Sequence, residues 1–227
     1  KSVAFSSAQS DIKPEIASVY VYQNTNQLVF VATDSFRLAE KRIQVKGIQN
    51  FSPLLIPTKN IQDIIRILED VGGDVEFLVS KNQIAFSGTR FYLTSRVVDG
   101  MYPDYQQIIP KQTVSSVTLL RSDLVDALRV SSVFSDKFGH MTLSLHPETK
   151  KCFITAISDI GENNAEIASV LEGEAVDVHL NIRYLTEALA VIGDDSLVIS
   201  VVGGTKPVIV RPVGNPTFLY LIMPMNR

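Results

Sequence analysis

The sequence has one cysteine, Cys152, and no tryptophan among its 227 residues. A single cysteine excludes an internal disulfide and a metal cluster held by several cysteines. Polar and apolar residues alternate around Cys152, so we expect a buried strand residue rather than a reactive thiol. No apolar run reaches the roughly 18 residues that a helix needs to cross a bilayer. The fold must therefore be held together by packed cores.

Motifs of the common catalytic and nucleotide-binding sites are also missing. The chain has no G-x-x-x-x-G-K-[ST], no G-x-S-x-G and no G-x-G-x-x-G pattern. Gly203 and Gly204 follow a predicted strand, but no helical pattern follows them, so they do not predict a phosphate-binding loop. Three histidines lack ligand spacing to a cysteine or a carboxylate cluster; they are His140, His146 and His179. We therefore expect no metal and no cofactor.

Neither sign of charge is in large excess. The chain has 21 Lys and Arg and 24 Asp and Glu, which gives a net charge of −3 at pH 7. A protein that binds nucleic acid over its whole surface is usually basic, so any such contact here must be local. Hydrophobic residues make up 45% of the chain, which is enough for folded cores. The length suits one large domain or two of about 110 residues each.

Residues 97–110, near the middle of the chain, predict a connector. The stretch begins as the end of a strand, is interrupted at Asp99 and Gly100, and is held extended by two prolines. Its apolar side chains are expected to be covered; they are Met101, Tyr102, Tyr105, Ile108 and Ile109. We therefore predict two domains, residues 1–110 and 111–227, with the connector at residues 99–110. A long loop within a single domain is the alternative.

The two halves show the same order of patterns. Alternating stretches predict strands at residues 16–22, 27–33, 36–45, 51–56, 74–80, 83–87 and 91–98, and again at 115–120, 141–146, 151–157, 164–171, 177–180, 197–202, 207–211 and 217–223. Helical spacing appears at residues 58–69, from residue 121 and from residue 181, and residues 1–10 resemble the end of a helix. We predict an internal duplication, repeated again within each half. Helices on antiparallel sheets give an α+β fold.

Single residues predict where the helices begin and which side is buried. The expected N-caps are Thr58, Ser122 and Asn181. Gly72 and Gly73 are expected to end the first helix. The apolar face of the second helix is expected to consist of Leu124, Leu128, Val130 and Val133.

Three short stretches carry more specific information. They are Ala-Thr-Asp-Ser-Phe-Arg-Leu-Ala at residues 32–39, Val-Asp-Gly-Met-Tyr-Pro-Asp-Tyr at 98–105 and Leu-Ile-Met-Pro-Met at 221–225. Alone, the first predicts a hairpin in which Asp34 and Arg37 pair or cap the turn. The third predicts an apolar strand whose methionines suit a surface that accepts varied side chains. Together, in this order and spacing, they resemble signatures of the bacterial sliding clamp, the beta subunit of DNA polymerase III.

The resemblance extends over essentially the whole chain and corresponds to the second and third of the family's three domains. It implies two duplicated sliding-clamp domains, each with two helices on one face of antiparallel sheets. The first domain, and the opening strand and half helix of the second, are expected to be missing. In the family, two protomers join head to tail into a ring around duplex DNA, with the helices lining the hole. A fragment without the first domain is not expected to close such a ring.

The resemblance also implies a function. The expected protein is a non-catalytic, cytoplasmic processivity factor, a homodimer at full length. It tethers the DNA polymerase III alpha subunit, the clamp loader and other clamp-motif proteins, which dock a short peptide into a groove between the two domains. The contact with duplex DNA is expected to be independent of sequence and sensitive to salt.

The partner-peptide residues are carried over position by position. One subsite is expected from Thr33, Leu38, Pro103, Ile108, Leu221 and Met223, with Arg37 beside it. The wall continues through Pro224 and Met225, and a second subsite is expected from Ile16, Phe138, Asn181, Tyr184, Thr205 and Pro207. Ser35 and Phe36 stand where the family often has glycine and histidine, and Gln107 where a basic residue is common. These departures bear on which peptide motif is preferred.

Two further surfaces follow from the resemblance. The cations expected to face DNA are Lys13, Lys59, Arg66, Arg129 and Arg183. The dimer interface is expected at Ser132, Val133 and Phe134.

Two alternatives remain open. One is a two-domain protein-interaction adaptor without DNA binding, against which the outward cations of the helices argue. The other is an enzyme using Asp34, Arg37 and Asp104 in a cleft between domains, which lacks a nucleophile and base at recognisable spacing.

Overall fold

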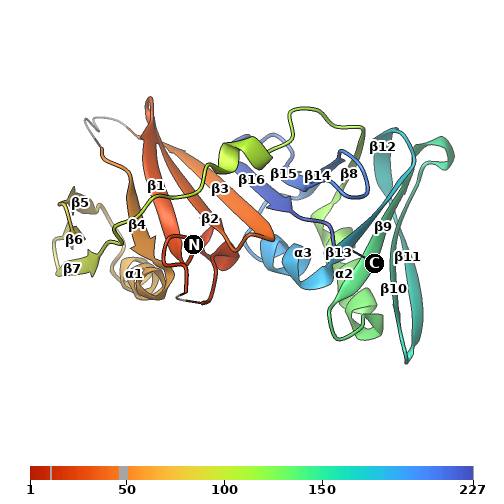
Figure 1. The fold of residues 1–227 in the computed structure, drawn as a ribbon, viewed down its shortest axis with the longest axis horizontal. Helices are drawn as coiled ribbons and strands as arrows, with labels where there is room; N and C mark the ends of the chain where they lie inside the picture. The colour runs from red at the N-terminus through yellow and green to blue at the C-terminus, as the bar shows by residue number, and fades with distance from the viewer. Residues whose placement is uncertain (11, 46–50, 227) are drawn as a thin grey trace. The chain divides into compact units, whose positions relative to one another are not determined.

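The computed structural model describes residues 1–10, 12–45 and 51–226 (Figure 1). The chain divides into two compact units, Lys1–Pro103 and Asp104–Arg227. Each unit combines helices with antiparallel sheets, so the α+β fold class is confirmed. The predicted connector, residues 99–110, includes the point of division, and its role as a connector stays a prediction. In the part of the chain that is described, no helix is long and apolar enough to cross a membrane.

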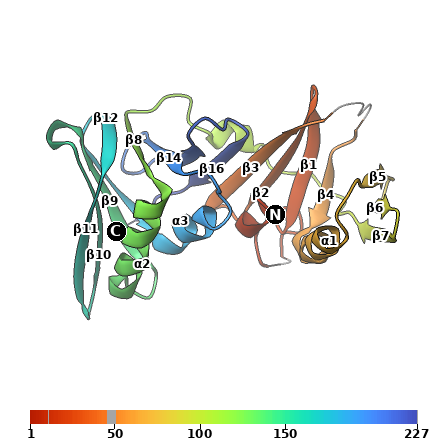
Figure 2. The same cartoon turned by 180° about the vertical axis from the view of Figure 1, so that it is seen from behind.

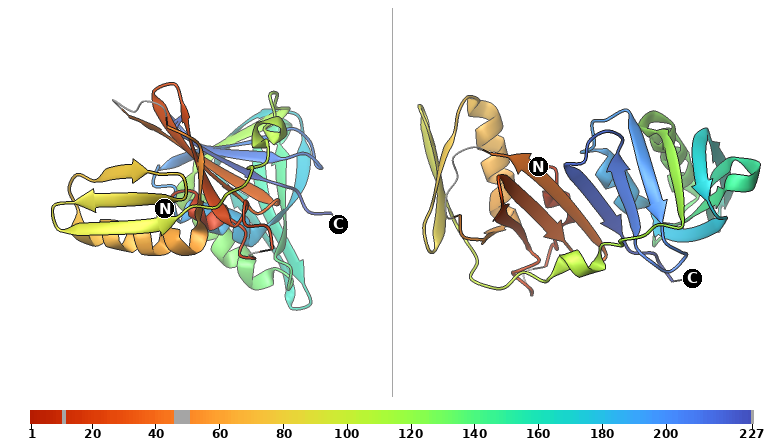
Figure 3. Two further views of the ribbon diagram at one scale, coloured as in Figure 1. Left: turned by 60° about the vertical axis from the view of Figure 1, so that its left-hand side comes forward. Right: turned by 90° about the horizontal axis from the view of Figure 1, so that it is seen from above.

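The first unit pairs a four-stranded sheet with a three-stranded one. Its elements are η1 (Ala4–Ser6), β1 (Ser18–Asn24), β2 (Gln27–Thr33), β3 (Arg37–Gln44), β4 (Leu54–Pro57), α1 (Thr58–Val71), β5 (Glu76–Val79), β6 (Gln83–Gly88) and β7 (Phe91–Arg96). The strand orders are β3-β2-β1-β4 and β5-β6-β7, with antiparallel neighbours. Helix α1 packs against β1, β4 and β7, and Figure 3 shows it beside the yellow three-stranded sheet. The helix expected over residues 1–10 is present only as the three-residue 3-10 helix η1.

The second unit has the same plan with two α-helices and two additional strands. Its elements are η2 (Tyr105–Ile108), β8 (Ser115–Leu120), α2 (Arg121–Phe134), β9 (His140–His146), η3 (Pro147–Thr149), β10 (Lys151–Ser158), β11 (Gly161–Ile167), β12 (Ser169–Gly173), β13 (Val176–Asn181), α3 (Ile182–Leu189), β14 (Ser196–Val201), β15 (Val208–Pro212) and β16 (Phe218–Ile222). The strand orders within this unit are β11-β10-β9-β13 and β12-β8-β14-β15-β16. Helices α2 and α3 lie side by side (Figure 2).

The predicted duplication is confirmed at both levels. The order β3-β2-β1-β4 in the first unit matches β11-β10-β9-β13 in the second, and β5-β6-β7 matches β14-β15-β16. Within the second unit, β8-α2 precedes one three-strand meander and β13-α3 precedes the other. Each leading strand joins the opposite meander, because β8 pairs with β14 and β13 pairs with β9. This exchange ties the two halves of the unit into one core.

The duplication identifies an open sheet edge in the first unit. The strand β14 is paired on both sides, by β15 and by β8. Its counterpart β5 pairs with β6, and among the described residues no strand pairs with its other edge. On β5 the apolar side chains of Leu78 and Val79 are exposed. Unpaired backbone groups and exposed apolar side chains make this edge the least protected part of the sheet.

Two of the three predicted helix caps are wrong. Helix α1 begins at Thr58, but the Thr58 hydroxyl is buried and accepts no helix N–H group. Helix α2 also has no side-chain cap, since the Ser122 hydroxyl donates to Asp123 Oδ1 at 3.1 Å instead. In both, the N-cap position is held by a residue without a side-chain acceptor, Pro57 for α1 and Leu120 for α2, and the predicted residue lies inside the helix. The cap at Asn181 is confirmed, because its Oδ1 accepts from the Arg183 N–H group at 2.9 Å.

The predicted apolar face of α2 is half wrong. Leu124 and Leu128 are buried as expected, but Val130 and Val133 are exposed. The remaining buried positions are Ala127 and Ser131, which complete the i, i+3, i+4, i+7 stripe that starts at Leu124. Val133 is nine residues beyond Leu124 and therefore on the opposite side of a helix with 3.6 residues per turn.

Two further expectations fail. The strand predicted over residues 164–171 is divided between β11 and β12, which belong to different sheets, and no glycine or proline marks the corner at Ala168. Of the apolar side chains expected to be covered in the connector, Tyr105 is buried but Met101 is 90% exposed and Ile108 is 45% exposed. Composition alone could not show which apolar side chains of the connector are buried and which are exposed.

Candidate functional site

The second unit has an open apolar depression of about 490 Å³, here called the Met223 depression. Three segments form its walls: η2 with the loop after it, the β14–β15 turn, and the residue that follows β16. The lining residues are Gln107, Ile108, Pro110, Lys111, Gln112, Val202, Lys206, Pro207 and Met223. The structure thus brings together four of the predicted partner-peptide residues of this unit, which are Gln107, Ile108, Pro207 and Met223. The other five lining residues were not predicted to contact a peptide, because nothing in the sequence shows that these segments meet at one depression; they are Pro110, Lys111, Gln112, Val202 and Lys206.

A second group of predicted residues lies where α3 begins. Asn181 Nδ2 donates to the Phe138 carbonyl at 3.0 Å, while its Oδ1 caps α3. Phe138 itself is exposed, and its ring makes an edge contact with His140 at 5.8 Å between centroids. Gly139 has φ +73°, and a Cβ there would lie 3.2 Å from Asn181 Oδ1. The loop before β9 is therefore fixed against the helix, with the Phe138 ring turned toward solvent.

The chain after β16 continues beside the same region. The Met225 N–H group donates to the His179 carbonyl at 2.8 Å. The buried Tyr220 donates its hydroxyl hydrogen to the Tyr184 carbonyl at 2.9 Å. These bonds place Tyr184 and Met225 at fixed positions, whereas Leu221 is fully buried in β16. Thr205 lies exposed in the β14–β15 turn.

Asp136 organises the loop that presents Phe138. Its Oδ1 accepts from the Phe138 and His140 N–H groups, both at 3.0 Å, and its Oδ2 lies 2.6 Å from His140 Nδ1. The hydrogen bond with the His140 side chain, followed by that with the His140 backbone, lowers the pKa of Asp136 below its ordinary value. The ionised carboxylate is therefore the form that holds the loop.

Acid is expected to release this loop. Because the pKa of Asp136 is lower in the folded state, its stabilising contribution is present above the unfolded value, roughly 3.9. The contribution disappears as the pH falls through the lower folded value. Backbone amide signals of Phe138 and His140, followed by NMR through the acid range, should report this step. The Asp136→Asn variant should lack it, and an equal step in that variant would contradict the assignment.

In the first unit the predicted residues form the tip of the β2–β3 hairpin. Asp34 Oδ1 accepts from the Phe36 and Arg37 N–H groups at 2.9 and 3.0 Å, and its Oδ2 accepts from Arg37 Nε at 2.9 Å. The Thr33 hydroxyl donates to the Arg37 carbonyl at 2.7 Å. The Arg37 guanidinium also lies 5.7 Å from the centroid of the Phe5 ring. The prediction that Asp34 and Arg37 pair and cap the turn is confirmed.

The hairpin tip leaves one large side chain in solvent. Phe36 is 62% exposed, whereas Thr33, Arg37 and Leu38 are buried. Ser35 has φ +78°, a conformation that glycine adopts without cost and serine does not. This explains why glycine suits this turn position. Ile16 is partly buried and Pro103 is exposed.

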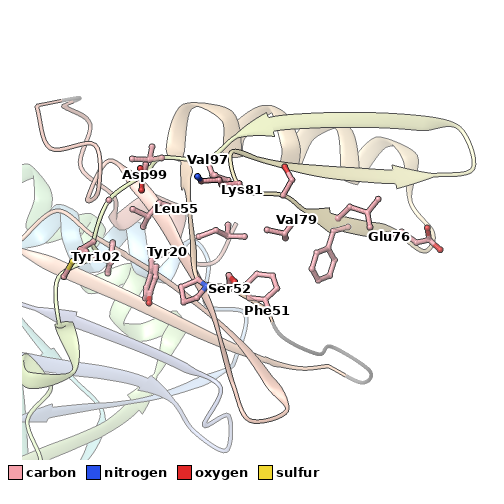
Figure 4. Close-up of a pocket in the computed structure, with 18 of the residues that line it drawn as sticks. Tyr20, Phe51, Ser52, Leu55, Glu76, Val79, Lys81, Val97, Asp99 and Tyr102 are labelled. Carbon is pink, nitrogen blue, oxygen red and sulfur yellow. The ribbon is translucent and has the colours of Figure 1, made fainter.

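A larger cavity of about 1450 Å³ lies along the open edge of β5. Its lining consists of Tyr20, residues 51–55, residues 75–81 and residues 97–102. Figure 4 shows Tyr102 beside Tyr20, whose rings are stacked with centroids 4.7 Å apart. Burial raises the pKa of Tyr102 far above its ordinary value. None of the predicted partner-peptide residues lines this cavity.

The expected DNA-facing cations are all exposed, and three of them are paired with an acid on the same helix. The pairs join Arg66 to Asp63 at 2.8 Å, Arg129 to Asp126 at 3.0 Å and Arg183 to Glu187 at 3.7 Å. Lys59 lies exposed on α1 and Lys13 precedes β1. By sequence α1 carries two cations and three acids, α2 two of each, and α3 one of each. The helices are therefore not strongly basic.

Ser132, Val133 and Phe134 form the end of α2, where the dimer contact is expected. Ser132 and Val133 are exposed, while Phe134 is partly covered and lies beside Gly161 of the edge strand β11. Cys152 is fully buried in β10, and burial raises the pKa of its thiol to about 11. The prediction of an inert strand cysteine is confirmed. The described residues contain no group of three His, Cys, Asp or Glu that could hold a metal ion.

Comparison with known proteins identifies the family. Residues 1–104 match the family described as DNA polymerase III beta subunit, central domain, and residues 106–226 match its C-terminal domain. The chain belongs to the DNA polymerase III beta subunit family. The resemblance inferred from the three sequence stretches is thereby confirmed. These two matches meet close to the division between the two compact units of the chain.

Relatives of this chain carry the name Beta sliding clamp. It is 28% identical to that of Synechococcus elongatus over 228 residues, and 25% identical to that of Staphylococcus aureus over 224 residues. Both alignments cover 98% of this chain, but only 61% and 59% of the relatives. Among solved structures, the Bacillus subtilis sliding clamp has a TM-score of 0.95 at 24% identity, covering 100% of this chain and 60% of that one. The Pseudomonas aeruginosa beta subunit has a TM-score of 0.94 at 25% identity, covering 99% and 62%.

Proposed function

We propose that this chain acts as the central and C-terminal part of a bacterial DNA sliding clamp, a non-catalytic processivity factor. The match of both consecutive units to the beta subunit family carries the proposal. In this role the protein works in the cytoplasm, binds duplex DNA without sequence preference and tethers the polymerase, the clamp loader and other clamp-motif proteins. The full-length protein would be a homodimer, with the end of α2 at the contact.

The Met223 depression is proposed as a docking site for the partner peptide. Three apolar side chains from separate segments face it, Ile108, Pro207 and Met223, and an apolar anchor buried there gains roughly 1.5–3 kcal/mol. The exposed Phe138 ring and the chain after β16 are proposed to contact the remainder of the peptide. Peptide contacts by the β2–β3 hairpin stay a prediction from the family resemblance; the residues are Thr33, Ser35, Phe36, Arg37 and Leu38.

Substitution of Met223 by alanine is expected to weaken binding of a short Gln-plus-Leu/Phe clamp-motif peptide about tenfold. Removing most of an apolar wall costs about 1.4 kcal/mol, which is a factor of ten in the dissociation constant. Isothermal titration calorimetry on the 227-residue chain measures this directly. Met101→Ala is the matched control, because Met101 is 90% exposed and outside the depression. Equal loss in both variants, or no binding to the folded wild type, would contradict the proposed site.

Binding to duplex DNA is proposed to be weak and limited by the acids beside the helix arginines. Neutralising them in an Asp63→Asn, Asp126→Asn, Glu187→Gln variant is therefore expected to tighten binding several-fold at about 0.01 M salt, since exposed charges act over about 30 Å there. Fluorescence anisotropy with two duplexes of unrelated sequence is the measurement. Glu166→Gln is the control, because that acid pairs with Lys151 on strands β11 and β10. A gain confined to one duplex, or none, would argue for the adaptor alternative.

A further inference from the structure

The Met223 depression combines apolar walls with charge of one sign. Its lining contains two cations, Lys111 and Lys206, and no aspartate or glutamate. Both lysines are exposed, one in the loop after η2 and the other in the β14–β15 turn. They therefore approach the depression from two separate chain segments.

Neither lysine has an acidic partner in the described structure. Elsewhere in the same unit, exposed cations such as Arg129, Arg183 and Lys151 lie within 4 Å of a carboxylate. Asp104 is the acid closest in sequence to the η2 residues that line the depression. Its Oδ2 accepts a hydrogen bond from Gln107 Nε2 at 2.7 Å. The positive charge of the two lysines is therefore left for a ligand.

The backbone holds these segments in place. The β14–β15 turn is closed by the Lys206 N–H group donating to the Gly203 carbonyl at 3.1 Å, with Gly203 at φ +155°. The loop after η2 is fixed where the Val114 N–H group donates to the Val201 carbonyl at 2.8 Å. Both lysines thus project from anchored turns. A backbone that is already anchored loses less entropy when its side chains engage a ligand.

We propose that the Met223 depression selects peptides that carry an acidic residue next to the apolar anchor, and that Lys111 and Lys206 are the specificity-determining residues. The proposal rests on the proposed function of the depression as a peptide-docking site. The apolar anchor contacts Ile108, Pro207 and Met223, which supply affinity. The carboxylate meets the lysines at the rim, where it remains partly solvated and supplies preference among partners. Charge at a rim acts chiefly through preference and rate of association.

The experiment compares two synthetic peptides with the same Gln-plus-Leu/Phe motif. One carries a glutamate on each side of the motif, and the other carries a glutamine at both places. The glutamate peptide is expected to bind about twofold to fivefold more tightly at low salt, the range of exposed ion pairs. The preference for the glutamate peptide should shrink in about 0.5 M NaCl, because salt screens the attraction between exposed charges. It should disappear in the Lys111→Gln, Lys206→Gln variant and persist in Lys150→Gln, an exposed lysine outside the depression.

The outcomes separate this inference from the function on which it rests. Equal affinity of both peptides, still weakened by Met223→Ala, would overturn the acidic preference and leave the docking site intact. A preference that persists in the double lysine variant would equally overturn the assignment to these residues. Failure of both peptides to bind the folded chain would overturn the docking site together with its selectivity.

Discussion

Replacing Asp34 by alanine is expected to destabilise the first unit by about 3 kcal/mol. The carboxylate accepts two backbone N–H groups at the hairpin tip and pairs with Arg37, whose side chain is only 9% exposed. Removing one partner of a buried ion pair leaves a desolvated charge and typically costs roughly 3–5 kcal/mol. The lost turn hydrogen bonds add to this, while residual solvation of the guanidinium subtracts. Hydrogen exchange of the β2 and β3 amides measures the change in local opening free energy.

Two control variants divide this effect into its parts. Asp34→Asn keeps an oxygen acceptor for the turn but removes the charge, so it should cost less than Asp34→Ala. Glu40→Gln removes a carboxylate from the middle of β3 that pairs with Arg42, and its effect should not extend to the hairpin tip. If Asp34→Ala left exchange at the tip unchanged, the ion pair would have no structural role.

Local sequence signals predicted much of the fold. Strands β2 and β8 have the predicted bounds, because polar turn residues flank one and a connector precedes the other. The repeat of patterns predicted the duplication, and the Asp34–Arg37 pair follows from their spacing across a turn. Such features depend on neighbours in the chain, which a sequence displays directly.

Features that depend on distant segments were not predictable. Nothing in the alternation of residues 164–171 signals that one strand ends at Ile167 and that the next strand, which begins at Ser169, belongs to a different sheet. The exchange of β8 and β13 between meanders, and hence the open edge of β5, becomes visible only from strand pairing. Strand patterns specify which face is buried, whereas partner choice is set by the whole core.

The candidate site was predicted unevenly for the same reason. Met223, Ile108 and Pro207 follow from the family resemblance, and the structure places them around one depression. The resemblance carries no expectation for Lys111 and Lys206. Exposed lysines are common on any surface, and only their shared position at a depression without acids makes them informative.

Substitution of Asn181 by alanine is expected to destabilise the second unit by about 2 kcal/mol. The side chain caps α3 through the Arg183 N–H group at 2.9 Å and holds the Phe138 carbonyl at 3.0 Å. Loss of an N-cap costs about 1 kcal/mol, and loss of a further hydrogen bond about 1 kcal/mol. Urea denaturation followed by circular dichroism should show a lower midpoint.

Asn181→Asp distinguishes the two roles. Aspartate is an equally good cap and interacts favourably with the helix N-terminus, but it cannot donate to the Phe138 carbonyl. The variant should therefore recover the stability that comes from the cap while freeing the loop at Phe138. If Phe138 contacts the partner peptide as proposed, Asn181→Asp should weaken peptide binding more than it weakens the fold. Full retention of binding would mean that neither the Asn181 amide nor the position of the Phe138 ring is needed for docking.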